Sequence, residues 1–168
     1  MSLPSGNYII TSKVPDGQSL SIGRNLAEDK SLLPKKVISL PPGVEAPVWA
    51  VQLLDNGKYI LKIGGAATAE FEDKVFAVLL DVPIPTEWTI THVPQHGPNV
   101  YMLSISLYRS RTVTHISFCR IEKGDRSTGW VVPEEEPYTQ IAVRPLIATR
   151  SLPPQYLPSE QFHIIPIE

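Results

Sequence analysis

The sequence predicts an all-β protein built from three similar lobes. Two observations carry this prediction: roughly ten to twelve short β-branched or alternating runs bounded by Gly, Pro, Asn or Asp, and a repeated pair of strands. No segment has a convincing helical period over a dozen residues. The 17 prolines are spread through the chain, where they disfavour helix interiors and mark strand ends and turns.

The repeated unit is an aromatic-led strand that turns and returns as a Tyr-apolar-apolar strand. "VWAVQLLDNGKYILKI" is the first copy and "EWTITHVPQHGPNVYMLSI" is the second. The third copy is split, because "FHIIPI" near the end of the chain leads and "SGNYII" near its start supplies the tyrosine. The last strand must then pair with the first, which predicts a β-trefoil: a closed six-stranded barrel capped by three hairpins. We expect one β-trefoil domain over residues 1–168.

Alternate residues of the aromatic-led strands are expected to point into the barrel, as core side chains rather than ligand contacts. They are Trp49, Val51, Leu53, Trp88, Ile90, Phe162 and Ile164. The third lobe is longer than the other two, and we assign its extra length to residues 122–138 and 148–160. Long insertions on a rigid barrel are frequent places for function.

The composition of the chain argues against two classes of partner, nucleic acids and membranes. The hydrophobic fraction is 42% and the charged fraction 19%, and the net charge is -2. This charge balance does not suggest a nucleic-acid partner, which would favour a basic stripe. The longest apolar runs, such as "VFAVLL", are too short to cross a bilayer as a helix, so no membrane partner is expected. The start of the sequence lacks a secretory signal and the single cysteine, Cys119, reads as a core thiol, which favours a cytoplasmic protein.

Catalytic and metal-binding patterns are absent from the sequence. The four histidines lack metal-ligand spacing, and there is no GxSxG, P-loop or GxGxxG motif. We therefore expect a binding protein with no cofactor and no metal, and not an enzyme. A carbohydrate-binding lectin is one alternative, although the Gln-x-Trp pattern of ricin-like lobes is replaced by "PVW", "TEW" and "EQF".

The opening "MSLPSGNYIIT", the strand pair "VWAVQLLDNGKYILKI" and the closing "FHIIPIE" resemble the mushroom β-trefoil protease inhibitors, the group of clitocypin, the macrocypins, cospin and cnispin. The resemblance covers the whole chain in architecture. It implies a protease as the partner and a role in fungal defence. Members of the group inhibit cysteine proteases, serine proteases or legumain through different loops, so the resemblance leaves the target open.

The stretch "TRSLPPQ" at 149–155 favours a trypsin-like serine protease as that target. Such a protease has a deep specificity pocket with a carboxylate at its base, which accepts a long basic side chain from a stiff, extended segment. Arg150 is the predicted pocket residue, and the two prolines stiffen the segment that follows it. Its neighbours in the predicted inhibitory loop are Thr149, Ser151, Leu152, Pro153 and Pro154. With no cysteines to tie it, the loop must be held by the strands "IAVRPLIA" and "FHIIPI", which we expect in the barrel.

A second candidate is Arg24 in "SIGRNLAEDK", with Asn25 following the bond that a protease would cleave. Some members of the resembled group use an arginine between the second and third strands, although no proline stiffens this segment before Pro34. Inhibition of papain-like cysteine proteases remains a further alternative. The segment 64–67, which resembles a legumain-inhibiting loop in position, carries no asparagine. We expect the inhibitor to be a monomer.

Overall fold

Twelve strands build the fold in the residues that the computed structural model describes, which are 3–12, 19–81, 85–92, 99–105, 128–147, 150–151 and 157–167. Six of them form a closed antiparallel barrel. These are β1 (Gly6–Ser12), β4 (Trp49–Leu53), β5 (Tyr59–Ile63), β8 (Thr89–His92), β9 (Val100–Ile105) and β12 (Phe162–Pro166). Ladders join β12 to β1, β1 to β4, β4 to β5, β8 to β9 and β9 to β12, and a bridge between Tyr59 and Trp88 joins β5 to the start of β8.

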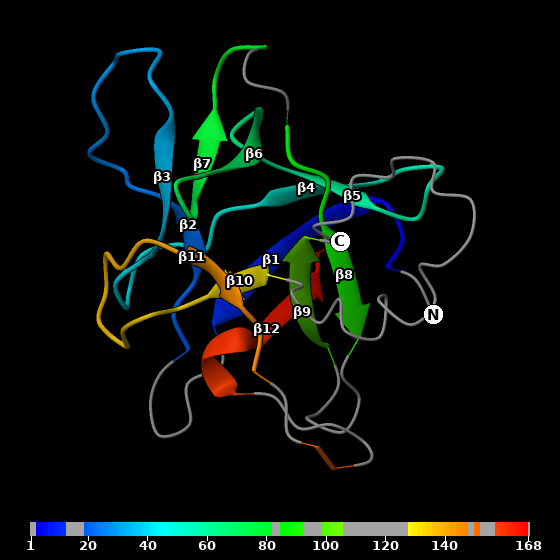
Figure 1. Cartoon of the computed structure of the whole chain (residues 1–168). Coiled ribbons are helices and arrows are strands. Elements are labelled where there is room, and N and C mark those ends of the chain that lie inside the picture. Colours follow the sequence, from blue (N-terminus) through cyan, green and yellow to red (C-terminus); the bar gives the residue numbers. More distant parts are fainter. Residues whose placement is uncertain are drawn as a thin grey trace.

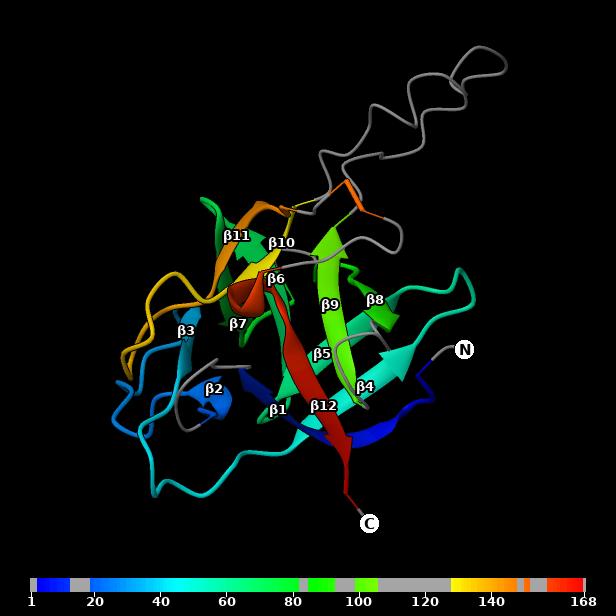
Figure 2. The ribbon, with the colours of Figure 1, turned by 90° about the horizontal axis from the view of Figure 1, so that it is seen from below.

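Three hairpins cover one end of this barrel (Figures 1 and 2). They are β2 (Ile22–Arg24) with β3 (Lys35–Ser39), β6 (Ala66–Phe71) with β7 (Lys74–Val78), and β10 (Thr128–Val131) with β11 (Ala142–Pro145). The hairpins also pair with one another, through β3–β7, β7–β11 and a bridge from Ile38 to Gln140. A 3-10 turn, η2 (Pro158–Glu160), precedes β12. The barrel and its cap make the predicted β-trefoil.

The predicted threefold repeat is visible in the strand register. Each repeat tyrosine lies directly opposite the leading aromatic residue of the neighbouring strand: Tyr8 opposite Trp49, Tyr59 opposite Trp88, and Tyr101 opposite Phe162. The two halves of the split copy are joined by the β1–β12 ladder, which runs over five residue pairs. Closure in this way removes the free sheet edges that an open β-protein would expose.

The interior positions follow the predicted alternation. Trp49, Trp88, Phe162 and Ile164 are fully buried and Val51 is nearly so, whereas Leu53 and Ile90 are partly buried against the same core. At the centre of the cap, Val37, Val75 and Ile141 occupy equivalent positions in the three hairpins and are also fully buried. Their backbones are joined, since the Ile141 amide donates to the Val37 carbonyl at 2.9 Å and the Val75 amide to the Ile141 carbonyl at 3.0 Å.

Trp130 is the centre of the aromatic core. Its ring centroid lies 5.8 Å from Trp49, 5.4 Å from Trp88 and 5.8 Å from Phe162. The equivalent positions in the other hairpins are Ile22 and Thr68, which instead accept hydrogen bonds from the indoles: Trp49 Nε1 donates to the Ile22 carbonyl and Trp88 Nε1 to Thr68 Oγ1, both at 2.8 Å. Phe162 has no such donor, and the large Trp130 side chain packs against its ring instead.

The position of Trp130 corrects the prediction that residues 122–138 are an insertion. Residues 128–131 form β10, and the β10–β11 connection (132–141) is as long as the β2–β3 connection (25–34). The extra length next to β10 therefore belongs to residues 106–127, which lie outside the described residues together with Cys119. The spacing between the repeat tyrosines gives only the total extra length of the third lobe and does not say which connection contains it.

Replacing Trp130 by alanine should destabilise the protein by about 3–5 kcal/mol, because the removed indole leaves a cavity between three rings. Urea unfolding followed by far-ultraviolet circular dichroism measures this change in the free energy of unfolding. Tyr138→Ala is the control, since this side chain is 60% exposed and its loss should cost under about 0.5 kcal/mol. Equal effects of the two substitutions would contradict a central role for Trp130.

Candidate functional site

The two candidate arginines lie in different parts of the molecule. Arg24 is the last residue of β2, and Arg150 lies in the connection from β11 to β12. In Figures 1 and 2, the short segment at 150–151 lies outside the barrel and well apart from the β2–β3 connection. Each arginine must therefore be judged from its own surroundings.

Arg24 is held by its neighbours. It pairs with Val37 in the β2–β3 ladder, so it belongs to a strand rather than to the connection that follows. Its Nε donates to both carboxylate oxygens of Glu28, at 2.9 and 3.3 Å, and its side chain is 21% exposed. The guanidinium also lies against Gly64, where an added Cβ would meet it at 3.0 Å. A side chain held in this way would have to leave Glu28 before it could enter a protease pocket.

The connection that follows Arg24 is ordered by local hydrogen bonds. Asn25 Oδ1 accepts from the Ala27 amide at 3.0 Å, which is the geometry of an Asx turn. The buried Lys35 ammonium contacts the Asp29 carboxylate and donates to the Asp29 carbonyl at 3.1 Å and to Ser31 Oγ at 3.2 Å. The hydrogen bond from Lys35 is the main cause that lowers the pKa of Asp29 to about 2.

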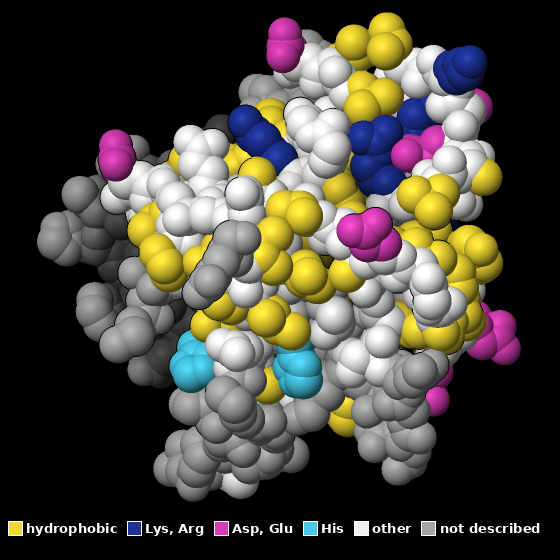
Figure 3. All heavy atoms as spheres, turned by 180° about the vertical axis from the view of Figure 1, so that it is seen from behind, with side chains coloured by type: hydrophobic (Ala, Val, Ile, Leu, Met, Phe, Trp, Pro, Cys, Tyr) yellow, Lys and Arg dark blue, Asp and Glu magenta, His cyan; other side chains and the backbone are white. Residues whose placement is uncertain are grey.

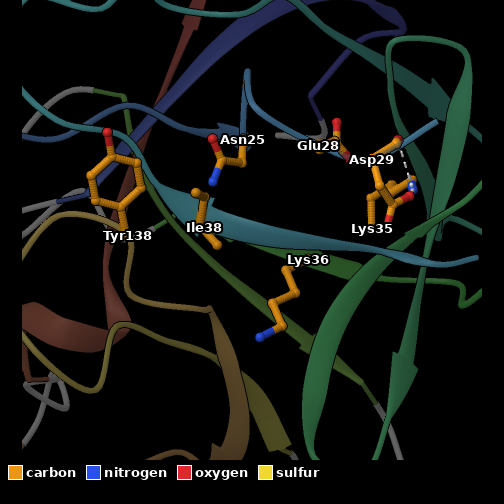
Figure 4. A pocket seen from close by; sticks show the side chains of 7 residues that line it. All are labelled: Asn25, Glu28, Asp29, Lys35, Lys36, Ile38 and Tyr138. Carbon is orange, nitrogen blue, oxygen red and sulfur yellow. Dashed lines mark hydrogen bonds and ion pairs between the residues drawn. The ribbon is translucent and has the colours of Figure 1, made fainter. Parts of the chain in front are cut away.

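These side chains border a shallow pocket of about 300 Å³. Figure 4 shows Asp29 and Lys35 paired on one side, with Lys36 pointing away from that pair and Tyr138 on the opposite rim. The lining carries charges of both signs, and each carboxylate on it faces a cation of this chain. Both carboxylates of the lining are therefore already paired within the chain, so they offer no free acidic pair to a cation.

Arg150 is differently placed. It and Ser151 are both exposed. Thr149, Leu152, Pro153 and Pro154, the other members of the predicted loop, lie outside the described residues. Described structure resumes at Leu157, just before η2. The predicted inhibitory arginine is thus accessible to a partner, between two well-defined ends.

A buried carboxylate joins those two ends. Glu160 is 2% exposed; its Oε1 accepts from the Ile147 amide at 2.6 Å and its Oε2 from the Leu157 amide at 3.4 Å. Burial raises the pKa of Glu160, while the two amide hydrogen bonds act in the opposite direction. Sequence reasoning missed this residue, although a carboxylate three positions after Leu157 and two after Pro158 is a signal for the start of a helical turn.

The expected supports of the segment around Arg150 need one correction. β12 is a barrel strand as predicted, but β11, from "IAVRPLIA", belongs to a cap hairpin and pairs with β10 and β7. β11 is part of the cap because both of its pairing partners, β10 and β7, belong to cap hairpins. The turn η2 takes part in the support, since the Val132 amide donates to the Ser159 carbonyl at 2.9 Å.

Other possible sites find little support. The leading aromatic residues are fully buried, so they are unavailable for stacking on a sugar. In the part of the chain that the structure describes, no group of three His, Cys, Asp or Glu side chains could hold a metal ion, and no helix is long and apolar enough to span a bilayer. On the face drawn in Figure 3, the coloured basic side chains gather at one end with acidic ones beside them, and among these described residues they form no continuous basic stripe.

Comparison with known proteins assigns the family. The family described as peptidase inhibitor I66 matches residues 1–110 and 111–166. A "Serine protease inhibitor" from Lentinula edodes is 35% identical over 167 residues, covering 99% of this chain and 100% of the relative. The solved structure of a proteinase inhibitor from Coprinopsis cinerea superposes with a TM-score of 0.79 at 38% identity, covering 99% of this chain and 100% of that one. With the trefoil topology and the absence of an enzyme motif, these matches show that the chain belongs to the peptidase inhibitor I66 family.

Proposed function

We propose that this protein inhibits trypsin-like serine proteases by presenting Arg150 to the specificity pocket as a substrate would. The observation that carries the proposal is the contrast between its two candidate arginines. Arg150 is exposed in a connection whose ends are fixed, whereas Arg24 is largely covered and bound to Glu28. Among the described residues, Arg150 has no hydrogen bond or ion pair to give up when a protease binds it.

The chemistry of "TRSLPPQ" supports the same assignment. A guanidinium suits a pocket with a carboxylate at its base, and one such buried, paired residue can dominate the affinity of an interface. Ser151 is a small residue on the other side of the bond that would be cleaved. Pro153 and Pro154 restrict the backbone that follows, which lowers the entropy lost on docking.

Family membership makes a peptidase the expected partner. The serine class is supported by the description of the Lentinula edodes relative as a serine protease inhibitor. Preference for trypsin within that class rests on the basic side chain of Arg150, since chymotrypsin-like and elastase-like pockets favour apolar residues.

Titration of trypsin with the wild-type protein, Arg150→Ala and Arg24→Ala tests the proposal. We expect stoichiometric inhibition by the wild type and by Arg24→Ala, and an inhibition constant raised by about a thousandfold or more in Arg150→Ala, because a hot-spot side chain is removed. Arg150→Lys should keep most of the inhibition, since lysine also reaches the pocket carboxylate. Full inhibition by Arg150→Ala combined with its loss in Arg24→Ala would move the site to β2.

Releasing Arg24 from its ion pair gives an independent test. Glu28→Ala should leave the inhibition constant within about threefold of the wild type. It should change the free energy of unfolding by under about 1 kcal/mol, because both side chains of the pair still contact solvent, 21% and 19% exposed. The measurement is the same trypsin titration, with urea unfolding beside it. A tenfold change in the inhibition constant would mean that the β2–β3 connection takes part in binding.

A further inference from the structure

The connection that carries Arg150 is an insertion relative to the other two lobes. Ser39, Ala77 and Val143 are equivalent residues in the second strands of the three cap hairpins. The next leading aromatic residue follows 10 positions later in the first lobe (39 to 49), 11 in the second (77 to 88) and 19 in the third (143 to 162). The third connection is therefore eight or nine residues longer.

The carboxylate of Glu160 spans this insertion. Its two amide partners, Ile147 and Leu157, flank residues 148–156, a nine-residue segment that matches the extra length. Both partner residues have exposed side chains, 61% for Ile147 and 45% for Leu157, whereas the carboxylate between them is buried. The corresponding connections in the other two lobes are shorter and contain no inserted segment whose two ends could be linked.

Capping of η2 accounts for only one of the two hydrogen bonds that Glu160 accepts, the one from the Leu157 amide. Because burial raises the pKa of Glu160, the folded chain holds this proton to a higher pH than the unfolded chain does. The stability that this group contributes is therefore present below the unfolded pKa and is lost as the pH rises through the folded pKa. The hydrogen bond from the Ile147 amide, which reaches across the insertion at 2.6 Å, is not part of the turn and calls for another explanation.

We propose that Glu160 is a positioning residue for inhibition: a clamp, formed with the amides of Ile147 and Leu157, that holds the two ends of the Arg150 segment together without a disulfide. The inference rests on the proposed function. Both carboxylate oxygens are needed as acceptors, and hydrogen bonds to a charged acceptor are stronger than neutral ones. Fixing the ends lowers the chain entropy that the segment loses when a protease binds it.

The clamp also affects whether the protease permanently cleaves the bound segment. The protease serine oxygen adds to the carbonyl carbon of Arg150, and its proton passes through the protease histidine to the Ser151 nitrogen as the peptide bond breaks. If the new amine stays close, it attacks the acyl carbon, the peptide bond re-forms, and the proton returns to the serine oxygen. If the amine leaves, water hydrolyses the acyl-enzyme and the inhibitor is cut.

Glu160→Gln is the central experiment. A glutamine offers one acceptor oxygen, and its amide group cannot accept the second backbone proton. We expect the inhibition constant for trypsin to rise about tenfold or more, the cost of losing a hydrogen bond to a charged acceptor. Chain cleaved after Arg150 should accumulate during long incubation, as seen by mass spectrometry. The midpoint of urea unfolding should not fall.

Glu87→Gln is the matched control. Glu87 directly precedes the leading aromatic residue of the second lobe, and its carboxylate contacts Asn56 and Lys58 on the surface. It has no contact with the segment around Arg150 among the described residues. Its substitution should leave both the inhibition constant and the cleavage rate unchanged.

Leu157→Pro tests the same hydrogen bond by removing its donor, the Leu157 amide. Leu157 has φ −67° and ψ 145°, which proline adopts, so the substitution removes the N–H donor with little demand on the backbone of that residue. It should weaken inhibition and speed cleavage as Glu160→Gln does. The double variant should be no worse than either single one, because both remove the same hydrogen bond.

Unchanged inhibition and cleavage in Glu160→Gln would overturn the clamp, and so would additive effects of the two substitutions. Failure of the proposed function gives a different result: the wild type would not inhibit trypsin at all. The clamp would then be judged by amide hydrogen exchange, where Glu160→Gln should speed exchange at Ile147 and Leu157 while the core amides of β12 stay protected. Equal exchange in the two proteins would again overturn it.

Discussion

Pairing between β1 and β12 closes the barrel, and the other features of the fold depend on that closure. It joins the two halves of the third repeat, places Phe162 opposite Tyr101, and brings the third aromatic ring against Trp130. A closed barrel has little freedom to adjust, so the connections between its strands start and end at fixed points. The long third connection can therefore present an arginine without a disulfide, provided that its two ends are held.

Much of the architecture could be predicted because it repeats. The tyrosines and the leading aromatic residues recur in sequence, so their pairing across the barrel follows from the pattern alone. Trp130 could not be predicted in this way, since Ile22 and Thr68 occupy its position in the other lobes and share no chemistry with it. Three different side chains fill equivalent positions: two of them accept a hydrogen bond from an indole, and the third packs its own ring against Phe162.

The candidate site was less predictable than the fold, for a related reason. The basic residues are visible in the sequence, but their availability depends on partners that tertiary structure supplies. The spacing of Arg24 and Glu28 is compatible with an ion pair, yet the sequence does not say that Gly64 lies against the same guanidinium. The sequence signals that Glu160 can cap a turn begun at Leu157, but its second partner, the Ile147 amide, lies 13 residues earlier and is set by the tertiary structure.

Lys35 and Glu160 are both buried charged residues that form hydrogen bonds with backbone groups of a connection, but the two connections differ. Lys35 is covered and gathers acceptors from a connection that is ten residues long in two lobes, so its hydrogen bonds order a normal part of the trefoil. Glu160 is covered and accepts donors from an insertion found in one lobe. Desolvation opposes the burial of either charge, and in both places backbone groups compensate it. The hydrogen bonds of Lys35 order the β2–β3 connection of the cap. Those of Glu160 join the two ends of an accessible segment. On the proposed role of Glu160, the burial of its carboxylate serves the segment whose ends it joins, whereas the burial of Lys35 serves the cap itself.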